Sequence, residues 1–181
     1  MEHIEITPDF INIERVISNK NPKLLKVIPR FIISYLKRIL HVDQLNSAIY
    51  RNRDKMGVDF SVKILEEFGC KIIIRGAENI PLNERVIIAS NHPLGGVDGM
   101  ALMQAVGSVR KDIVFPVNDL LLNLPNLRVV FIPVNKHGSN ASNIKLFNDA
   151  FESDKAVLYF PAGMCSRKIN GVIQDLEWKK T

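Results

Sequence analysis

A histidine and an aspartate stand six positions apart in the stretch NHPLGGVDG, at His92 and Asp98. An imidazole whose orientation is fixed by a carboxylate can accept a proton from a substrate, as in general base catalysis. Pro93 favours an extended backbone at His92, while Gly95 and Gly96 permit backbone conformations and close approaches that side chains prevent. We therefore predict a proton-transfer pair whose nucleophile comes from the substrate. The alternative is an ordinary turn in which Asp98 caps a helix.

A second stretch, YFPAGMCSRK at 159–168, places glycine, hydroxyl and cationic residues just after an apolar run. Cationic side chains and backbone N–H groups of this kind can hold an anionic group. A further arginine opens the apolar run RVVFIPV at 128–134. The candidate catalytic residues are His92 and Asp98, and the candidate substrate-binding residues are Asn91, Gly95, Gly96, Arg128, Gly163, Ser166 and Arg167.

Short apolar runs alternate with helical patterns after residue 70, which predicts an α/β fold with a mixed, largely parallel sheet flanked by helices. Loops that follow parallel strands open on one edge of the sheet, so the two candidate loops should meet there. The run at 85–90 is apolar on both faces, and we expect a central strand. The predicted strands are 71–75, 85–90, 113–117, 129–134 and 156–160, and the predicted helices are 99–109, 119–124 and 142–153.

Residues 1–69 lack this alternation, and we expect them to form an N-terminal helical, membrane-surface segment ahead of an α/β core at 70–181. A helix should begin near Pro8, and a helical stretch at 43–69 should end at Gly69, because glycine favours the left-handed backbone after a helix. The chain stops soon after a loop, and we expect the core to be truncated at its C-terminal end.

Residues 20–41 combine bases with large apolar residues. Six lysines and arginines occur there, and no acid occurs before Asp43. Pro22 and Pro29 predict two helical pieces, with Pro29 near the start of the second. Such amphipathic helices suit an anionic membrane surface, where apolar side chains enter the acyl boundary. A helix packed on the protein core with a solvated basic face is equally compatible with the pattern.

The composition is that of a globular protein, with 46% apolar and 24% charged residues among 181. The net charge of +5 suits a nucleic acid, an anionic membrane or an acidic protein. Nucleic acid is disfavoured because the bases alternate with apolar residues and form no recognisable reading element. The two cysteines lack metal-site spacing, so we expect no metal. No apolar run of about 18 residues and no signal-peptide pattern occur, which favours the cytoplasm.

The three stretches NHPLGGVDG, RVVFIPV and FPAGMCSR resemble, in this order and spacing, the blocks of the phospholipid/glycerol acyltransferase superfamily. The resemblance covers roughly residues 70–170. Two features depart from the common pattern: the step from His92 to Asp98 is one residue longer, and Ala162 stands where that pattern has glutamate. Both departures resemble the hemolysin-like branch, which includes the ornithine- and glycine-lipid N-acyltransferases.

This resemblance implies that an acyl group moves from a thioester of acyl carrier protein or coenzyme A to the amine of an amino acid or to a lysolipid. His92 would be the general base and Asp98 its orienting carboxylate, with glycine-loop N–H groups around the oxyanion. No metal or redox cofactor is implied. A lipid product also favours residues 20–41 as a contact to the anionic inner face of the cell membrane, with the protein peripheral and cytoplasmic.

Two alternatives stay open. One is an O-acyltransferase of the lysophosphatidic acid type, against which the missing glutamate at Ala162 weighs. The other is a non-catalytic module that binds a membrane or a carrier protein, against which the intact pair of His92 and Asp98 weighs. The sequence does not choose between an amine and a hydroxyl as the acceptor.

Overall fold

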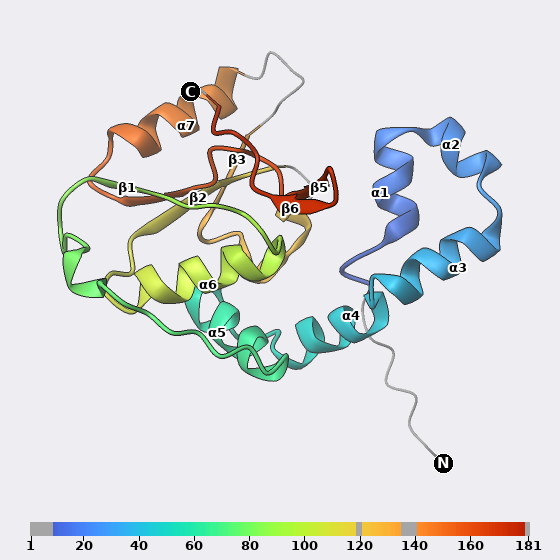
Figure 1. Ribbon diagram of the computed structural model, residues 1–181, viewed down its shortest axis with the longest axis horizontal. Coiled ribbons are helices and arrows are strands. Elements are labelled where there is room, and N and C mark those ends of the chain that lie inside the picture. Colours follow the sequence, from blue (N-terminus) through green and yellow to red (C-terminus); the bar gives the residue numbers. More distant parts are fainter. Residues whose placement is uncertain (1–8, 119–120, 135–140, 180–181) are drawn as a thin grey trace. The chain divides into compact units, whose positions relative to one another are not determined.

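The computed structural model describes residues 9–118, 121–134 and 141–179, and it divides into two units, Met1–Asp54 and Lys55–Thr181 (Figure 1). The second unit begins earlier than the expected boundary at 69/70 because the helix after Lys55 packs on a helix of the α/β region. None of the helices in the described part of the chain combines the length and apolar character needed to cross a bilayer.

The described part of the first unit is helical, with α1 at Ile13–Lys20, α2 at Pro22–Val27, α3 at Arg30–Ile39 and α4 at Val42–Arg51. The expected start near Pro8 lies outside the described residues. The predicted division of residues 20–41 at Pro29 is confirmed. Asn21 caps α2 by accepting the N–H groups of Lys23 and Leu24. Buried Asn46 bonds both the N–H and the C=O of Ile11, which fixes the entry to the unit.

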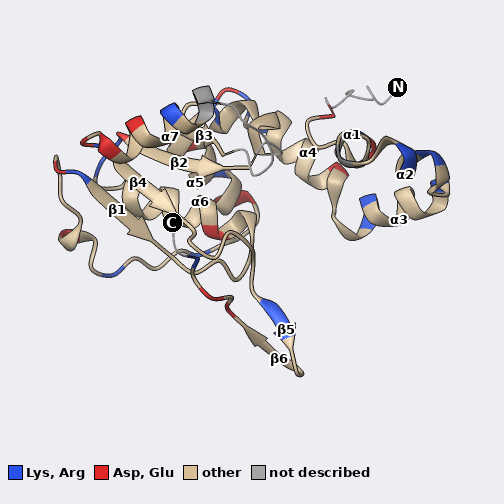
Figure 2. Cartoon of the chain, turned by 90° about the horizontal axis from the view of Figure 1, so that it is seen from above, with Lys and Arg blue, Asp and Glu red and all other residues tan. Residues whose placement is uncertain are grey.

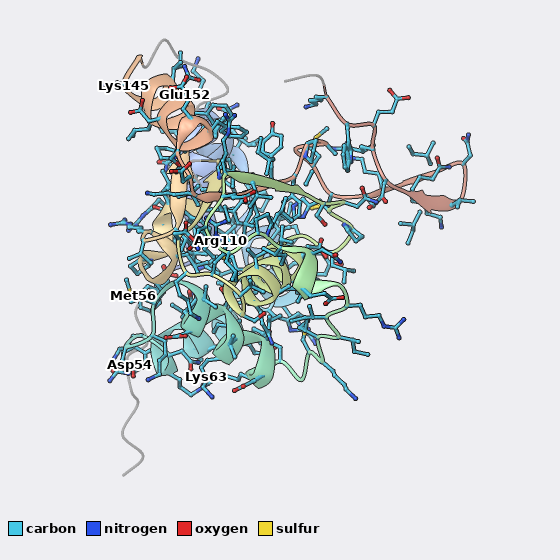
Figure 3. All side chains as sticks on the ribbon, turned by 90° about the vertical axis from the view of Figure 1, so that its left-hand side faces the viewer. Asp54, Met56, Lys63, Arg110, Lys145 and Glu152 are labelled. Carbon is cyan, nitrogen blue, oxygen red and sulfur yellow. The ribbon has the colours of Figure 1, made fainter. Side chains whose placement is uncertain are left out.

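The second unit contains a parallel sheet in the order β1-β4-β2-β3. Figures 1 and 3 show α5, which carries Lys63, and α6 on one side of this sheet and α7, which carries Lys145 and Glu152, on the other. A separate antiparallel hairpin, β5–β6, follows. The α/β class with a largely parallel, helix-flanked sheet is confirmed. The elements are α5 Gly57–Glu67, β1 Val86–Ala89, α6 Gly96–Gly107, β2 Ile113–Val117, β3 Phe131–Pro133, α7 Ala141–Glu152, β4 Ala156–Tyr159, β5 Arg167–Ile169 and β6 Val172–Gln174, with 3₁₀ turns at Ala77–Asn79, Leu121–Asn123 and Pro125–Leu127.

Two strand predictions were wrong. The strand β1 is an edge strand rather than a central one, because β4 lies between β1 and β2, and Ile87 is 45% exposed. The two inner strands are β4 and β2, and Ala156, Val157 and Leu158 of β4 are fully buried. Residues 71–75 form no strand, and Ile73 is 70% exposed, because no neighbouring strand pairs with this β-branched run.

The helical stretch predicted at 43–69 is two helices, α4 and α5, which belong to different units. The predicted end at Gly69 is confirmed: Gly69 has a φ of +67°, its N–H bonds the Glu66 carbonyl, and the Cys70 N–H bonds the Leu65 carbonyl. These two bonds form a Schellman motif. The predicted helix at 119–124 falls partly outside the described residues, and Leu121–Asn123 is a 3₁₀ turn.

Buried Arg110 joins the chain segments at the amino edge of the sheet (Figure 3). Its guanidinium makes two bonds of 2.6–2.7 Å to the Asp112 carboxylate and donates to the carbonyls of Pro81, Glu84 and Asp154. Because this guanidinium bonds the carboxylate, the pKa of Asp112 is held below its usual range. No sequence pattern indicated this junction, since the three carbonyls that Arg110 joins lie far from it along the chain.

Candidate active site

The loop that carries His92 leaves β1 at the carboxyl edge of the sheet. The Ser90 N–H bonds the Tyr159 carbonyl at 3.0 Å, so β1 and the neighbouring β4 end side by side. Gly95 precedes α6 with φ +73° and ψ −126°, a backbone conformation that glycine adopts and other residues rarely do. This reversal at Gly95 directs the chain from the loop into α6, and the helix begins at Gly96, three residues before its predicted start.

His92 and Asp98 meet, despite the longer step between them. Nδ1 of His92 lies 3.2 Å from Oδ2 of Asp98, and their side chains are 19% and 14% exposed. Asp98 is the third residue of α6, and the same Oδ2 accepts the Leu94 N–H at 2.6 Å. The imidazole is close enough for an ion pair but is not aligned for a hydrogen bond, so Nδ1 has no hydrogen-bond partner.

An aromatic side chain that the sequence analysis missed supports the His92 ring. Phe160 stacks on the imidazole with ring centroids 4.1 Å apart and planes 17° apart. Phe115 packs edge-on against Phe160 at 5.2 Å. Gly99 lies beside both rings, and a Cβ there would make ordinary van der Waals contacts, 3.5 Å from Phe115 and 3.9 Å from Phe160. The position of Phe160 could have indicated its role, because it directly follows β4 in the FPAG stretch.

The loop after β4 contacts the His92 loop, as the parallel arrangement predicts. The Ser166 N–H bonds the backbone carbonyl of His92 at 3.1 Å. A Cβ on Gly95 would lie 3.5 Å from the Cys165 sulfur, so the two loops also touch there. Gly163 has a positive φ, and its N–H donates to the Phe160 carbonyl within the loop. The Gly163 N–H is therefore already bonded and is not available for an anion.

Neither of the two candidate arginines bonds His92 or Asp98 in the described part of the chain. Arg128 precedes β3, at the amino edge of the sheet, and its Nε donates to the Leu122 carbonyl at 2.8 Å. Arg167 lies on the exposed strand β5, where its guanidinium contacts the Met164 sulfur at 3.1 Å. The anion-binding role expected for these residues has no geometric support in the described part of the chain.

The segment after β6, at 175–179, also lies at this site, which the sequence analysis did not foresee. Asp175 accepts a hydrogen bond from the Ser166 hydroxyl. The Trp178 indole N–H donates to the Asn91 side-chain oxygen at 3.2 Å, and the Lys179 N–H donates to the Pro161 carbonyl at 3.3 Å. This segment thus reaches both loops.

The arrangement of His92 and Asp98 is suited to proton transfer. In the described residues no cluster of three or more His, Cys, Asp or Glu side chains could hold a metal ion. Asp98 faces Nδ1 of His92, which leaves Nε2 as the nitrogen that can take a proton from a substrate. Tyr159 ends β4 nearby, and burial raises the pKa of its phenol, which stays protonated at neutral pH.

Comparison with known proteins identifies the family to which the chain belongs. A lyso-glycine lipid O-acyltransferase of Bacteroides thetaiotaomicron is 43% identical over 174 residues, which cover 95% of this chain and 64% of the relative. One of the same name from Phocaeicola vulgatus is 45% identical over 174 residues, which cover 95% of this chain and 62% of the relative. The chain thus spans less than two thirds of these relatives' length. No solved structure matches it. The sequence model of the acyltransferase family matches residues 15–181, and the chain belongs to this family.

Proposed function

We propose that the protein moves a fatty acyl group from a thioester to the hydroxyl of a lysolipid. The observation that carries the proposal is the pair of His92 and Asp98, 3.2 Å apart at the carboxyl edge of the sheet, in a chain of the acyltransferase family. The donor is the thioester of acyl carrier protein or coenzyme A, and the basic excess of the chain suits either anionic carrier.

The chemistry uses side chains alone. Nε2 of His92 takes the proton of the acceptor hydroxyl as its oxygen attacks the thioester carbonyl carbon. The Asp98 carboxylate stabilises the imidazolium that forms. When the tetrahedral intermediate collapses, the carbon–sulfur bond breaks and the departing thiolate takes the proton from His92. One ester bond forms, one thioester bond breaks, and the base returns to its starting state.

Of the two acceptors that the resemblance implies, the amine of an amino acid or a lysolipid, the relatives favour the hydroxyl of a lysolipid. Both are named for O-acylation of a lyso-glycine lipid, so we propose a lyso-glycine lipid as the acceptor. Ala162 is buried in the loop after β4, where a methyl group stands in place of the usual carboxylate. Lysophosphatidic acid is the second acceptor to test.

The first unit supplies the proposed membrane contact. Helix α2 buries no residue and α3 buries Ile33, while Val27, Phe31 and Tyr35 are 73%, 71% and 62% exposed. Figure 2 shows Lys and Arg along the same two helices. Apolar side chains beside bases fit an anionic bilayer surface. We propose that α2 and α3 place the protein on the inner face of the cell membrane.

Acyl transfer is tested by incubating the protein with acyl carrier protein or coenzyme A thioesters and either lyso-glycine lipid, lysophosphatidic acid or glycine. Mass spectrometry identifies the product. We expect the diacylated glycine lipid, and no product from His92→Ala with an unchanged circular dichroism spectrum. A product formed equally by His92→Ala would refute the mechanism. Binding of the carriers without any product would support a non-catalytic module.

Membrane binding is tested by co-sedimentation with phosphatidylglycerol or phosphatidylcholine vesicles. We expect binding to the anionic vesicles and its loss in Phe31→Ser. Ile73→Ser is the matched control, because Ile73 is 70% exposed and Phe31 is 71% exposed, but Ile73 lies in the second unit. Equal sedimentation of both variants and the wild type would contradict the assignment to α3.

A further inference from the structure

The segment 175–179 is placed at the site by the hairpin that precedes it. Asn170 and Gly171 both have positive φ, at 51° and 85°. Two consecutive residues with positive φ form the type of turn that joins the strands of tight two-residue hairpins. The turn fixes the register, with Arg167 opposite Gln174. This register brings Ser166 beside Asp175, and their side chains bond. Figure 2 shows the hairpin projecting from the sheet while the chain after β6 returns to it.

The returning segment joins loops that follow two different strands. Trp178 bonds Asn91, the residue before His92, and the Lys179 N–H bonds Pro161, the residue after Phe160. Phe160 is the ring on which the His92 imidazole stacks. The segment therefore contacts both the side chain of the residue before His92 and the backbone of the loop that supports its ring.

The Trp178 contact also sets the orientation of the Asn91 amide. An indole N–H only donates, so the amide oxygen of Asn91 must face it and the NH₂ group must point away. Since the backbone carbonyl of His92 is held by the Ser166 N–H, the residues on both sides of the Asn91–His92 peptide are fixed by groups outside the loop.

We propose that Trp178 is a positioning residue for His92, acting through Asn91, and that residues 175–179 form a clasp over the two loops. The proposal rests on the proposed acyl transfer for its kinetic effect. Trp178 is 55% exposed, so its indole adds little to the core and its loss should leave the fold intact. Its effect should fall on the rate of the chemical step, since a small displacement of a catalytic group slows chemistry more than binding.

The contact itself is tested without any assay of activity. Trp178 is the sole tryptophan of the chain, so a ¹⁵N-labelled sample gives a single indole N–H signal. We expect Asn91→Ala to shift this signal and to speed its exchange with water. An indole signal that Asn91→Ala leaves unchanged would overturn the clasp. This measurement decides the contact even if the wild-type protein transfers no acyl group, an outcome that would refute the proposed function alone.

The kinetic role is tested by a double-mutant cycle. Trp178→Phe keeps a ring but removes the N–H, and we expect kcat to fall about tenfold, as for the loss of one hydrogen bond, while KM stays within about twofold. Because both changes break the same contact, the double variant with Asn91→Ala should be no slower than Asn91→Ala alone. Ile173→Ser, on the exposed strand β6, is the control, with unchanged kcat. Effects that multiply, or an unchanged kcat in Trp178→Phe, would overturn the positioning role.

Discussion

The charge of Asp98 can be removed with little change of shape by the substitution Asp98→Asn. The Asp98 oxygen that faces His92 also accepts the Leu94 N–H, and an asparagine oxygen in this place can keep both contacts. The variant thus retains the loop geometry while the imidazolium formed during proton transfer loses its counter-charge. The expected defect is electrostatic, in kcat rather than in folding.

The size of the defect follows from the distance and the burial. Two unit charges about 4 Å apart attract by about 4 kcal/mol at an effective dielectric constant of about 20. His92 Nδ1 and Asp98 Oδ2 are 3.2 Å apart, and both side chains retain some exposure, which screens the charge. We take roughly 3–4 kcal/mol of lost transition-state stabilisation, which corresponds to a fall in kcat of about 10²–10³-fold.

The chain offers a matched control for this variant. Asp59 is the third residue of α5, as Asp98 is of α6, so Asp59→Asn removes the same charge from the same helical position. Both variants should lose at most about 1 kcal/mol of helix stabilisation, measured by urea unfolding. Acyl transfer is followed by the release of free thiol from acyl-coenzyme A. If Asp98→Asn kept kcat within about threefold of wild type, or if Asp59→Asn were equally slow, the role assigned to Asp98 would be refuted.

Further predictions concern stability and are measured by urea unfolding. Gly107→Ala should destabilise the protein by about 1–3 kcal/mol, because its Cβ would lie 2.6 Å from Val58 methyls on α5, whereas Gly96→Ala, with nothing within 4 Å, should be neutral or stabilising by up to about 1 kcal/mol. Arg110→Met should cost roughly 3 kcal/mol, since the carbonyls of Pro81, Glu84 and Asp154 lose the buried guanidinium that donates to them. Because the folded-state pKa of Asp112 is lowered, its pairing stabilises the fold above about pH 4 and is lost as pH falls through the folded-state pKa. The wild type should therefore lose more stability than Arg110→Met on acidification below pH 4.

Much of the fold follows from local patterns. The strands at 113–117 and 156–159, the break at Pro29 and the helix end at Gly69 follow from β-branched runs and from the backbone preferences of proline and glycine. Strand order does not follow from these patterns. The run at 85–90 is as apolar as a central strand, yet β1 is an edge strand. The apolar pattern of a strand reports its burial, whereas its place in the sheet depends on contacts with strands that are distant along the chain.

The candidate site was predictable where its residues follow a strand along the chain. His92, Asp98 and Ser166 lie in loops that parallel topology brings to one edge, and the structure brings these loops together. Phe160 and Trp178 were missed, because a stacked ring and a distant hydrogen-bond donor leave no spacing pattern in the sequence. Arg128 was expected at the same edge, but it precedes its strand and therefore lies at the amino edge, whereas the other candidates follow their strands.

The positive φ of Gly95 explains how His92 and Asp98 come together despite the longer step between them. An added residue would carry the carboxylate past the imidazole if the loop stayed extended, but the reversal at Gly95 starts α6 at once and brings Asp98 to its third position. From there Asp98 reaches back to the Leu94 N–H and to His92 together. The helix therefore orients the carboxylate toward the imidazole. The distance between the His92 and Asp98 side chains, rather than the count of residues between them, is therefore what supports their proposed catalytic role.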